Sequence, residues 1–146
     1  MRNRKPARGT RGRSIARRLA MQGLYQWQLT RQPGSLIKEQ LLEGDESAGV
    51  DAEYFAELLD GCIGNQTQIS AALTDCADRP LQQLDVVEAG ILMIGVYELQ
   101  HRIEIPYRVI INEAVELCKR FGATDAHKYV NAVLDRAARG IRTAEV

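Results

Sequence analysis

The most hydrophobic stretch of the chain lies between Asp85 and Gln100, and it leaves almost no polar face when it is wound as an α-helix. Its sixteen residues include Glu88 and Glu98, and they fall short of the roughly 20 apolar residues that a membrane-spanning helix needs. The run is too long for a typical strand, and its alanine, leucine and methionine residues favour helix. We therefore expect a buried central helix in an all-α domain, with Glu88 near its start.

Apolar residues recur at helical spacing in six further segments. The expected helices run from about residue 12 to 30, from 36 to 43, from 51 to 64, through 69–76, from 106 to 121 and from 125 to 140. Ser35 and Asp51 are predicted N-caps, and Gly122 is a predicted C-cap. Either Thr124 or Asp125 is expected to open the last helix. The inward stripe of the 106–121 helix is predicted to be Ile110, Ala114, Leu117, Cys118 and Phe121.

The sequence also predicts how the chain is divided. Residues 1–12 are polar and basic and are expected to form a flexible arm. The break at Asp78-Arg79-Pro80 suggests an N-terminal helical sub-domain over 13–80 and a C-terminal helical sub-domain over 81–142. The two would together make one compact domain, since 146 residues suit a single core.

The helix expected over 12–30 has one face that matters for function. Its apolar arc includes Leu19 and Leu24, and the opposite arc carries basic, polar and aromatic residues. That opposite arc consists of Ser14, Arg17, Arg18, Met21, Gln22 and Tyr25. Arginines contact phosphates, and an exposed tyrosine offers a flat face to a base. The alternative for Tyr25 is that a neighbouring helix covers it.

Charge is distributed unevenly along a chain whose formal net charge is zero. The first 20 residues contain eight basic side chains and no acid, which leaves 11 basic and 19 acidic residues in the rest. A basic arm on an acidic body favours a polyanionic partner for the arm. The alternative is a solubilising or self-docking tail.

Several function classes find no support in the sequence. Cys62, Cys76 and Cys118 lack C-x-x-C spacing and are expected to be buried free thiols in a reducing cytoplasm, with no metal site. No nucleotide-binding or hydrolase signature is present, and His101 and His127 have no nucleophile beside them. We therefore expect neither catalysis nor a cofactor. The N-terminus is basic but lacks the apolar core of a secretory signal, so we do not expect one, and its acid-free, arginine-rich start leaves an organellar transit peptide open.

The segment from Ile105 to Leu134, IPYRVIINEAVELCKRFGATDAHKYVNAVL, resembles the C-terminal signature of the NusB family of bacterial transcription antitermination factors. Further matches follow in order along the chain. They are RSIARR at 13–18, QGLYQW at 22–27, and VE at 87–88 followed by VYEL at 96–99. The resemblance covers roughly residues 13–142. It departs from the family pattern at Ser14 and Ile15, which interrupt the basic run, and at Cys118 and Ala132.

The resemblance implies an all-helical fold of two small bundles, a cytoplasmic location, and an arginine-rich first helix that binds single-stranded boxA RNA. The implied protein partner is the ribosomal protein NusE, and the pair would join RNA polymerase on ribosomal RNA operons. The RNA-binding residues carried over are Arg13, Ser14, Arg17, Arg18, Gln22, Tyr25, Lys128 and Tyr129. Glu88 and Asp125 match positions tied to NusE. A homodimer that hides the RNA surface is a further state compatible with the resemblance.

Two other functions stay open at this point. One is the NusB-like module of a ribosomal RNA methyltransferase, which would need a Rossmann-type domain with a glycine-rich cofactor loop after it. The other is a helical adaptor that binds only proteins, for which the basic arm would be incidental. Binding of boxA-like RNA would separate an adaptor from an RNA-binding factor.

Overall fold

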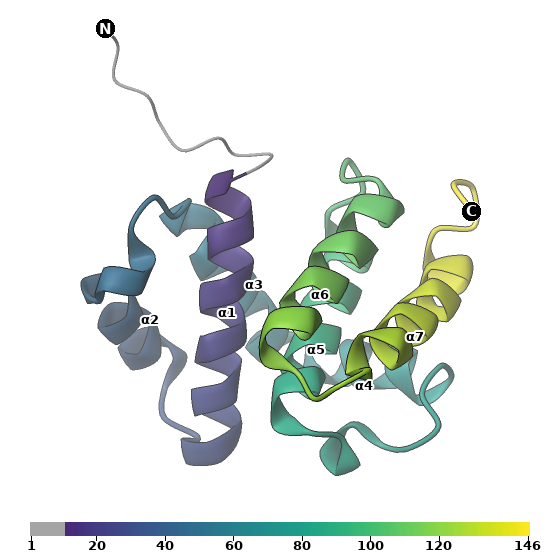
Figure 1. Ribbon diagram of the computed structural model, residues 1–146, viewed down its shortest axis with the longest axis horizontal. Coiled ribbons are helices and arrows are strands. Elements are labelled where there is room, and N and C mark those ends of the chain that lie inside the picture. Colours follow the sequence, from purple (N-terminus) through teal and green to yellow (C-terminus); the bar gives the residue numbers. More distant parts are fainter. Residues whose placement is uncertain (1–10) are drawn as a thin grey trace, which may run out of the picture. The chain divides into compact units, whose positions relative to one another are not determined.

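The computed structural model describes residues 11–146 and contains only helices over that range (Figure 1). The α-helices are α1 (Arg11–Thr30), α2 (Gly34–Glu43), α3 (Ala52–Gly64), α4 (Gln66–Thr74), α5 (Val86–His101), α6 (Tyr107–Phe121) and α7 (Ala126–Ile141). Two short 3-10 helices, η1 (Asp45–Ser47) and η2 (Leu81–Gln83), complete the set. The predicted all-α fold is confirmed. Ten of the twelve residues of the predicted basic arm lie outside the described part of the chain.

The chain divides into two compact units, one ending at Ile63 and one running from Gly64 to Val146. The first unit contains α1, α2, η1 and α3. Leu24, Ile37 and Leu59 are among its fully buried side chains, one from each α-helix. Gly23 allows α1 to approach α3 closely, since a Cβ there would lie 3.0 Å from a methyl group of Leu59. The predicted cap of α3 is confirmed: a carboxylate oxygen of Asp51 accepts a hydrogen bond from the main-chain N–H of Tyr54 at 3.1 Å.

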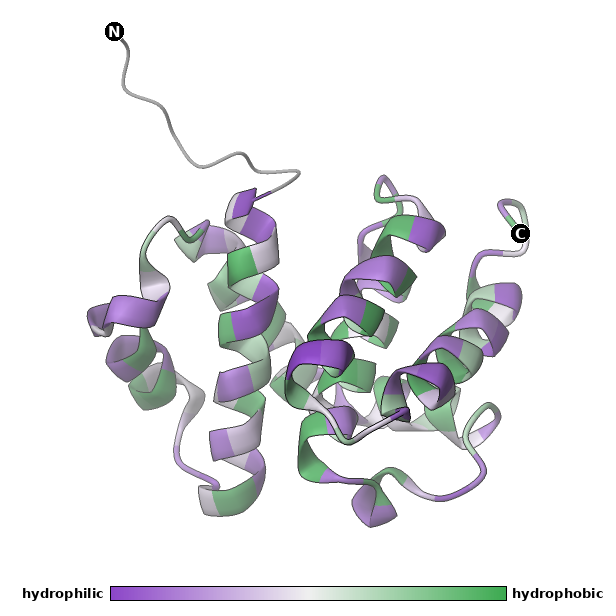
Figure 2. Cartoon of the chain, in the orientation of Figure 1, coloured by the Kyte–Doolittle hydropathy of each residue, from purple (hydrophilic) through white to green (hydrophobic). Residues whose placement is uncertain are grey.

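The second unit is built around α5, as the hydrophobic run predicts. Every residue of α5 from Ala89 to Leu99 is buried. The carboxylate of Asp85 caps this helix and accepts hydrogen bonds from the main-chain N–H groups of Val87 at 3.0 Å and Glu88 at 3.3 Å. Helices α6 and α7 pack on α5 and on each other, and Figure 2 shows both as alternating hydrophobic and hydrophilic bands. In the described residues no helix has the length and hydrophobicity to cross a membrane.

Helix α4 belongs to the second unit, because it packs against α5 and α7. The division between the units therefore falls after Ile63, whereas the sequence suggested the break at Asp78–Pro80. The proline there is a local interruption of the chain that precedes η2. A break in helical pattern shows where the backbone turns, and it does not show which helices share a core.

Three local expectations from the sequence are wrong. Ser35 is not an N-cap, because α2 already starts at Gly34 with Pro33 at the cap position. Phe121 is not part of the inward stripe of α6. It is the last residue of the helix, its side chain is 41 % exposed, and the Arg120 guanidinium lies 4.9 Å from its ring centroid. The last helix also continues one residue beyond 140, to Ile141.

A buried arginine joins the C-terminus of the chain to the end of α5. The side chain of Arg142 is fully buried, and its guanidinium donates a hydrogen bond to the Glu145 carboxylate. It also donates to four main-chain carbonyl oxygens at 2.8–3.3 Å, those of Glu98, Leu99, Arg102 and Ile105. Glu145 in turn accepts a hydrogen bond from the main-chain N–H of Tyr107 at 2.9 Å, in the first turn of α6. Arg142 therefore satisfies carbonyl groups that the end of α5 leaves open.

Candidate nucleic-acid interface

The outward arc predicted for α1 is exposed only in part. Gln22 and Tyr25 are exposed, and Arg13, Ser14 and Arg18 are half-buried. Arg17 and Met21, in contrast, are 3 % and 4 % exposed. Their assignment to an exposed face is therefore wrong. A helical projection gives the direction of a side chain and not what packs over it, and α1 is covered on more than one side.

Two arginines of α1 lie over one aromatic ring of α3. The Arg13 Cζ lies 4.5 Å from the ring centroid of Tyr54, and the Arg17 Cζ lies 5.7 Å from it. Both distances fall within the range in which a guanidinium is attracted to the negative face of an aromatic ring. The buried Nε of Arg13 has no hydrogen-bond partner in the described structure. Arg13 and Arg17 therefore form a cluster with Tyr54, a residue that sequence reasoning missed.

Arg18 is held differently, by a loop between α2 and α3. One terminal nitrogen of Arg18 donates a hydrogen bond to the main-chain oxygen of Glu46 at 2.7 Å and lies 3.6 Å from its carboxylate. The Glu46 side chain is mostly exposed, so water and salt weaken the attraction. The Arg18 guanidinium can therefore still attract an external anion, such as a phosphate.

Tyr25 offers an uncovered ring further along α1. It is 46 % exposed, and in the described part of the chain its side chain makes no hydrogen bond or ring contact. The alternative that a neighbouring helix covers Tyr25 is wrong. Leu29, four residues on, is 58 % exposed and lies on the same side of the helix. Leu29 extends this surface and was missed, since a single exposed leucine gives no signal in a sequence.

Tyr129 in the second unit is half-buried and fixed by an ion pair. Its hydroxyl donates a hydrogen bond to Asp78 Oδ1 at 3.0 Å, and Arg79 donates to the same carboxylate at 3.0 Å. The Arg79 guanidinium also lies 5.5 Å from the Tyr129 ring centroid. The hydrogen bond from Arg79, followed by the one from Tyr129, lowers the pKa of Asp78. Burial, with a smaller effect of Asp78, raises the pKa of Tyr129. Sequence reasoning found Tyr129 and missed Arg79, which adds a cation there.

The remaining predicted residues lie near the starts of helices α5 and α7. Glu88 is half-buried in the first turn of α5, and in the described residues no ion pair or side-chain hydrogen bond holds its carboxylate. Asp125 is exposed and occupies the N-cap position of α7 without a side-chain cap bond. The exposed Lys128 lies 3.7 Å from the Asp125 carboxylate. Both acids are therefore accessible to a partner.

The cysteines are free, and two of the three are buried as predicted, whereas Cys76 is half-buried. Burial, with smaller effects from the charges of Glu88 and Asp85, raises the pKa of Cys118 to about 11. The Cys118 thiol is therefore protonated at neutral pH and unreactive. Among the described residues, no group of three or more His, Cys, Asp or Glu side chains could hold a metal ion.

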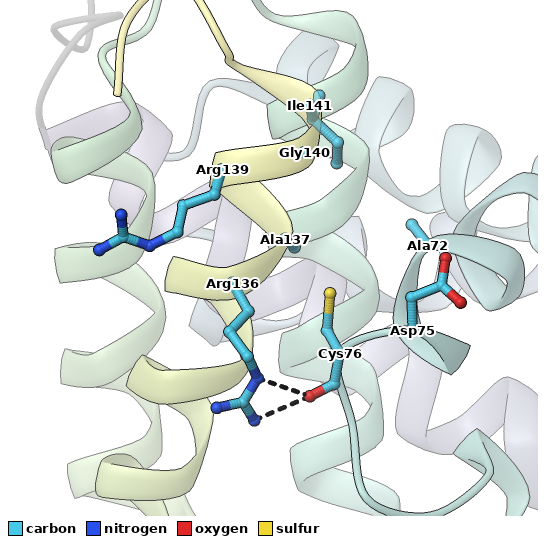
Figure 3. Close-up of a pocket in the computed structure, with 8 residues that line it drawn as sticks. All are labelled: Ala72, Asp75, Cys76, Arg136, Ala137, Arg139, Gly140 and Ile141. Carbon is cyan, nitrogen blue, oxygen red and sulfur yellow. Dashed lines mark hydrogen bonds between the residues drawn. The ribbon is translucent and has the colours of Figure 1, made fainter.

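A hollow of about 500 Å³ lies between α4 and α7 in the second unit (Figure 3). It is lined by Ala72, Asp75, Cys76, Arg136, Ala137, Arg139, Gly140 and Ile141. Arg136 donates two hydrogen bonds, at 3.0 and 2.8 Å, to the main-chain oxygen of Cys76. These bonds join the segment after α4 to α7 (Figure 3). Arg136 therefore stabilises the packing of this segment. The hollow does not include the residues predicted to bind RNA.

The profile of the NusB family matches residues 14–139 of this sequence. The chain belongs to the NusB family. Transcription antitermination protein NusB of Marinobacter nauticus is 45 % identical over 140 residues, which cover 96 % of this chain and 87 % of that protein. The protein of the same name from Alcanivorax borkumensis is 48 % identical over 133 residues, covering 91 % of this chain and 89 % of its own length. The resemblance stated from the motifs is confirmed.

Solved NusB structures share the fold. Thermotoga maritima NusB is 30 % identical, with a TM-score of 0.78 over 87 % of this chain and 90 % of that one. A structure described as antitermination factors NusB and NusE in complex with dsRNA is 24 % identical, with a TM-score of 0.78 over 90 % of this chain and 98 % of that one. At that identity the second likeness establishes the fold alone.

In this NusB family member, the predicted RNA-binding residues belong to both compact units. The α1 group comprises Arg13, Ser14, Arg17, Arg18, Gln22 and Tyr25. The α7 group comprises Lys128 and Tyr129. The α1 group, called the α1 patch below, has half-buried arginines and the exposed ring of Tyr25 on one helix. In the α7 group, the Tyr129 hydroxyl is hydrogen-bonded to Asp78 and the Arg79 guanidinium lies near the ring. Six of the eight predicted RNA-binding residues lie in the α1 patch, so it is the better candidate for the RNA-binding surface.

Proposed function

We propose that this chain is a transcription antitermination factor that binds boxA-type single-stranded RNA together with NusE, within the RNA polymerase complex that transcribes ribosomal RNA operons. The observation that carries the proposal is the α1 patch, in which one helix carries the half-buried arginines Arg13 and Arg18 and the exposed ring of Tyr25. Family membership and the names of the relatives support it. The chain acts by binding and not by catalysis.

The chemistry of the α1 patch suits an unpaired strand. Arginines attract the phosphates of any nucleic acid, whereas an exposed tyrosine can stack only on a base whose face is open. Bases in a duplex are stacked on one another, so a ring such as Tyr25 gains little from double-stranded RNA. Single-stranded RNA therefore uses both parts of the patch.

The test is a titration of fluorescently labelled boxA RNA, followed by anisotropy, with and without NusE. We expect the single strand to bind more tightly than a duplex of the same sequence, and NusE to strengthen binding further. A protein that binds NusE but neither form of RNA would instead be a helical adaptor. Equal affinity for duplex and single strand would remove the role of base stacking.

Glu88 is the residue proposed to contact NusE. A ribosomal protein is expected to be basic, and an accessible acid offers it complementary charge. Replacing Glu88 by glutamine should weaken NusE binding by about 1 kcal/mol or more if the pair is desolvated. The melting temperature should stay almost unchanged, because Asp85 already caps α5. Calorimetric titration with NusE, beside a thermal melt, measures both quantities.

Glu116→Gln is the matched control, since it removes an exposed acid from the middle of α6. It should leave the affinity for NusE unchanged. The opposing explanation is that Glu88 only favours the positive end of the α5 dipole. In that case Glu88→Gln would lower stability by a few tenths of a kcal/mol, as is typical of such charges, and NusE would bind as before.

A further inference from the structure

Tyr54 lies where it can fix the geometry of the arginine cluster. Its side chain is 2 % exposed, so the ring itself is not a surface for RNA. The ring comes from α3, while the two guanidiniums over it come from Arg13 and Arg17, one turn apart on α1. Buried aromatic rings have few accessible rotamers and therefore make rigid supports.

A pair of hydrogen bonds joins the start of α3 to the start of α1. The main-chain N–H of Asp51 donates to the main-chain oxygen of Gly12 at 3.1 Å. The carboxylate of the same residue accepts from the main-chain N–H of Tyr54 at 3.1 Å. Asp51 thus holds the start of α3, which carries Tyr54, beside the first turn of α1. These two hydrogen bonds connect the backbone that carries the Tyr54 ring to the first turn of α1, which carries Arg13.

An aromatic ring holds a guanidinium without cancelling its charge. A carboxylate at the same place would form an ion pair and reduce the attraction for an incoming phosphate. In the described part of the chain, no carboxylate pairs with Arg13, which is half-buried over the ring. Arg18, in contrast, lies 3.6 Å from the carboxylate of Glu46. A guanidinium stacked on a ring also keeps its N–H groups directed sideways, where phosphate oxygens can accept hydrogen bonds.

We propose that Tyr54 is a positioning residue for RNA binding, which holds the Arg13 guanidinium in place for phosphates of the bound strand. The inference rests on the proposed function. In this proposal a buried residue of α3 raises the RNA affinity of a surface on α1. The phosphate contact itself is made by Arg13, which is half-buried.

The test compares three variants in the RNA titration. Tyr54→Leu removes the ring and should weaken RNA binding about threefold to tenfold, the size expected for one or two cation–π contacts. Tyr54→Phe keeps the ring and should bind RNA like the wild type. Phe55→Leu is the matched control, because it removes the neighbouring buried aromatic of α3, on which no described arginine stacks. It should lower stability and leave RNA affinity unchanged.

A double-mutant cycle separates positioning from general destabilisation. In an Arg13→Ala background, Tyr54→Leu should lose most of its effect on RNA affinity, since the guanidinium to be positioned is gone. Fully additive effects, or unchanged affinity of Tyr54→Leu alone, would overturn the role of Tyr54 while leaving the proposed function standing. Wild-type protein that fails to bind RNA would overturn both.

A second measurement applies even if Tyr54→Leu fails to fold. In wild-type protein, side-chain NMR signals of Arg13 should be shifted by the ring current of Tyr54, both free and bound to RNA. Their identity follows from their loss in Arg13→Lys. Signals at the positions of an unstacked arginine would show that the ring does not hold this guanidinium, and the proposal would fail.

Discussion

Replacing Arg142 by alanine is expected to lower the free energy of unfolding by about 3–5 kcal/mol, the range found when one partner of a buried charged network is removed. The truncation would remove a donor from four carbonyl oxygens at the end of α5 and in the following loop, and it would leave those of Leu99 and Ile105 without the donor that Arg142 supplies. The oxygens of Glu98 and Arg102 would keep a main-chain hydrogen bond. Unsatisfied buried acceptors are expensive because water cannot replace the lost hydrogen bonds. Urea unfolding followed by circular dichroism measures the change.

Two further variants define the origin of that effect. Arg142→Lys keeps a cation but offers fewer donors in a different geometry, so its loss should be smaller than that of alanine and still clear. Arg139→Ala is the control, since Arg139 is exposed and pairs with Asp135 one turn away on α7. Such a pair contributes only about 0.3–0.5 kcal/mol. An Arg142→Ala protein as stable as Arg139→Ala would contradict the structural role given to this network.

Replacing Tyr25 by alanine should weaken binding of single-stranded RNA by roughly 1–3 kcal/mol, the value of one base–aromatic stack. Stability should change little, because the ring is 46 % exposed. Tyr25→Phe should be nearly silent, since stacking needs the ring and not the hydroxyl. Phe121→Ala is a suitable control, as it removes another exposed aromatic side chain outside the predicted site. Fluorescence anisotropy with labelled boxA RNA provides the affinities.

The comparison between phenylalanine and alanine at position 25 decides how the contact works. Equal losses for Tyr25→Phe and Tyr25→Ala would mean that the hydroxyl is the contact and that stacking is not. The substitution of tyrosine by phenylalanine is harder to interpret at Tyr129, because the hydroxyl already donates a hydrogen bond to Asp78. There a loss in Tyr129→Phe would combine the release of Asp78 with any effect on RNA.

The helices could be predicted from sequence where the signal is local. The run around α5 is hydrophobic on all sides, and Asp85 and Asp51 stand immediately before helices that they cap. The family motifs added residues whose roles periodicity alone could not assign, such as Glu88 and Asp125. Exposure of Tyr25 followed from its place on the polar arc of α1.

The contacts that could not be predicted join residues far apart in sequence. Arg17 faces the polar arc of α1 in projection but is covered, beside the ring of Tyr54 on α3. Arg142 binds main-chain carbonyl groups, which every residue carries, so no side-chain pattern reveals its partners. Leu29 and Arg79 were missed for a related reason: a lone leucine or a surface ion pair is common in any helical protein.

The central claim is that the arginines of α1 bind RNA phosphates, and the salt dependence of RNA affinity tests it most directly. If the half-buried Arg13 and Arg18 neutralise about two phosphates, the logarithm of the association constant should fall against the logarithm of salt concentration with a slope of roughly −1 to −2. In Arg13→Ala the slope should become shallower, and affinity should fall for all RNA sequences alike. A wild-type slope near zero, or an unchanged slope in Arg13→Ala, would contradict the account.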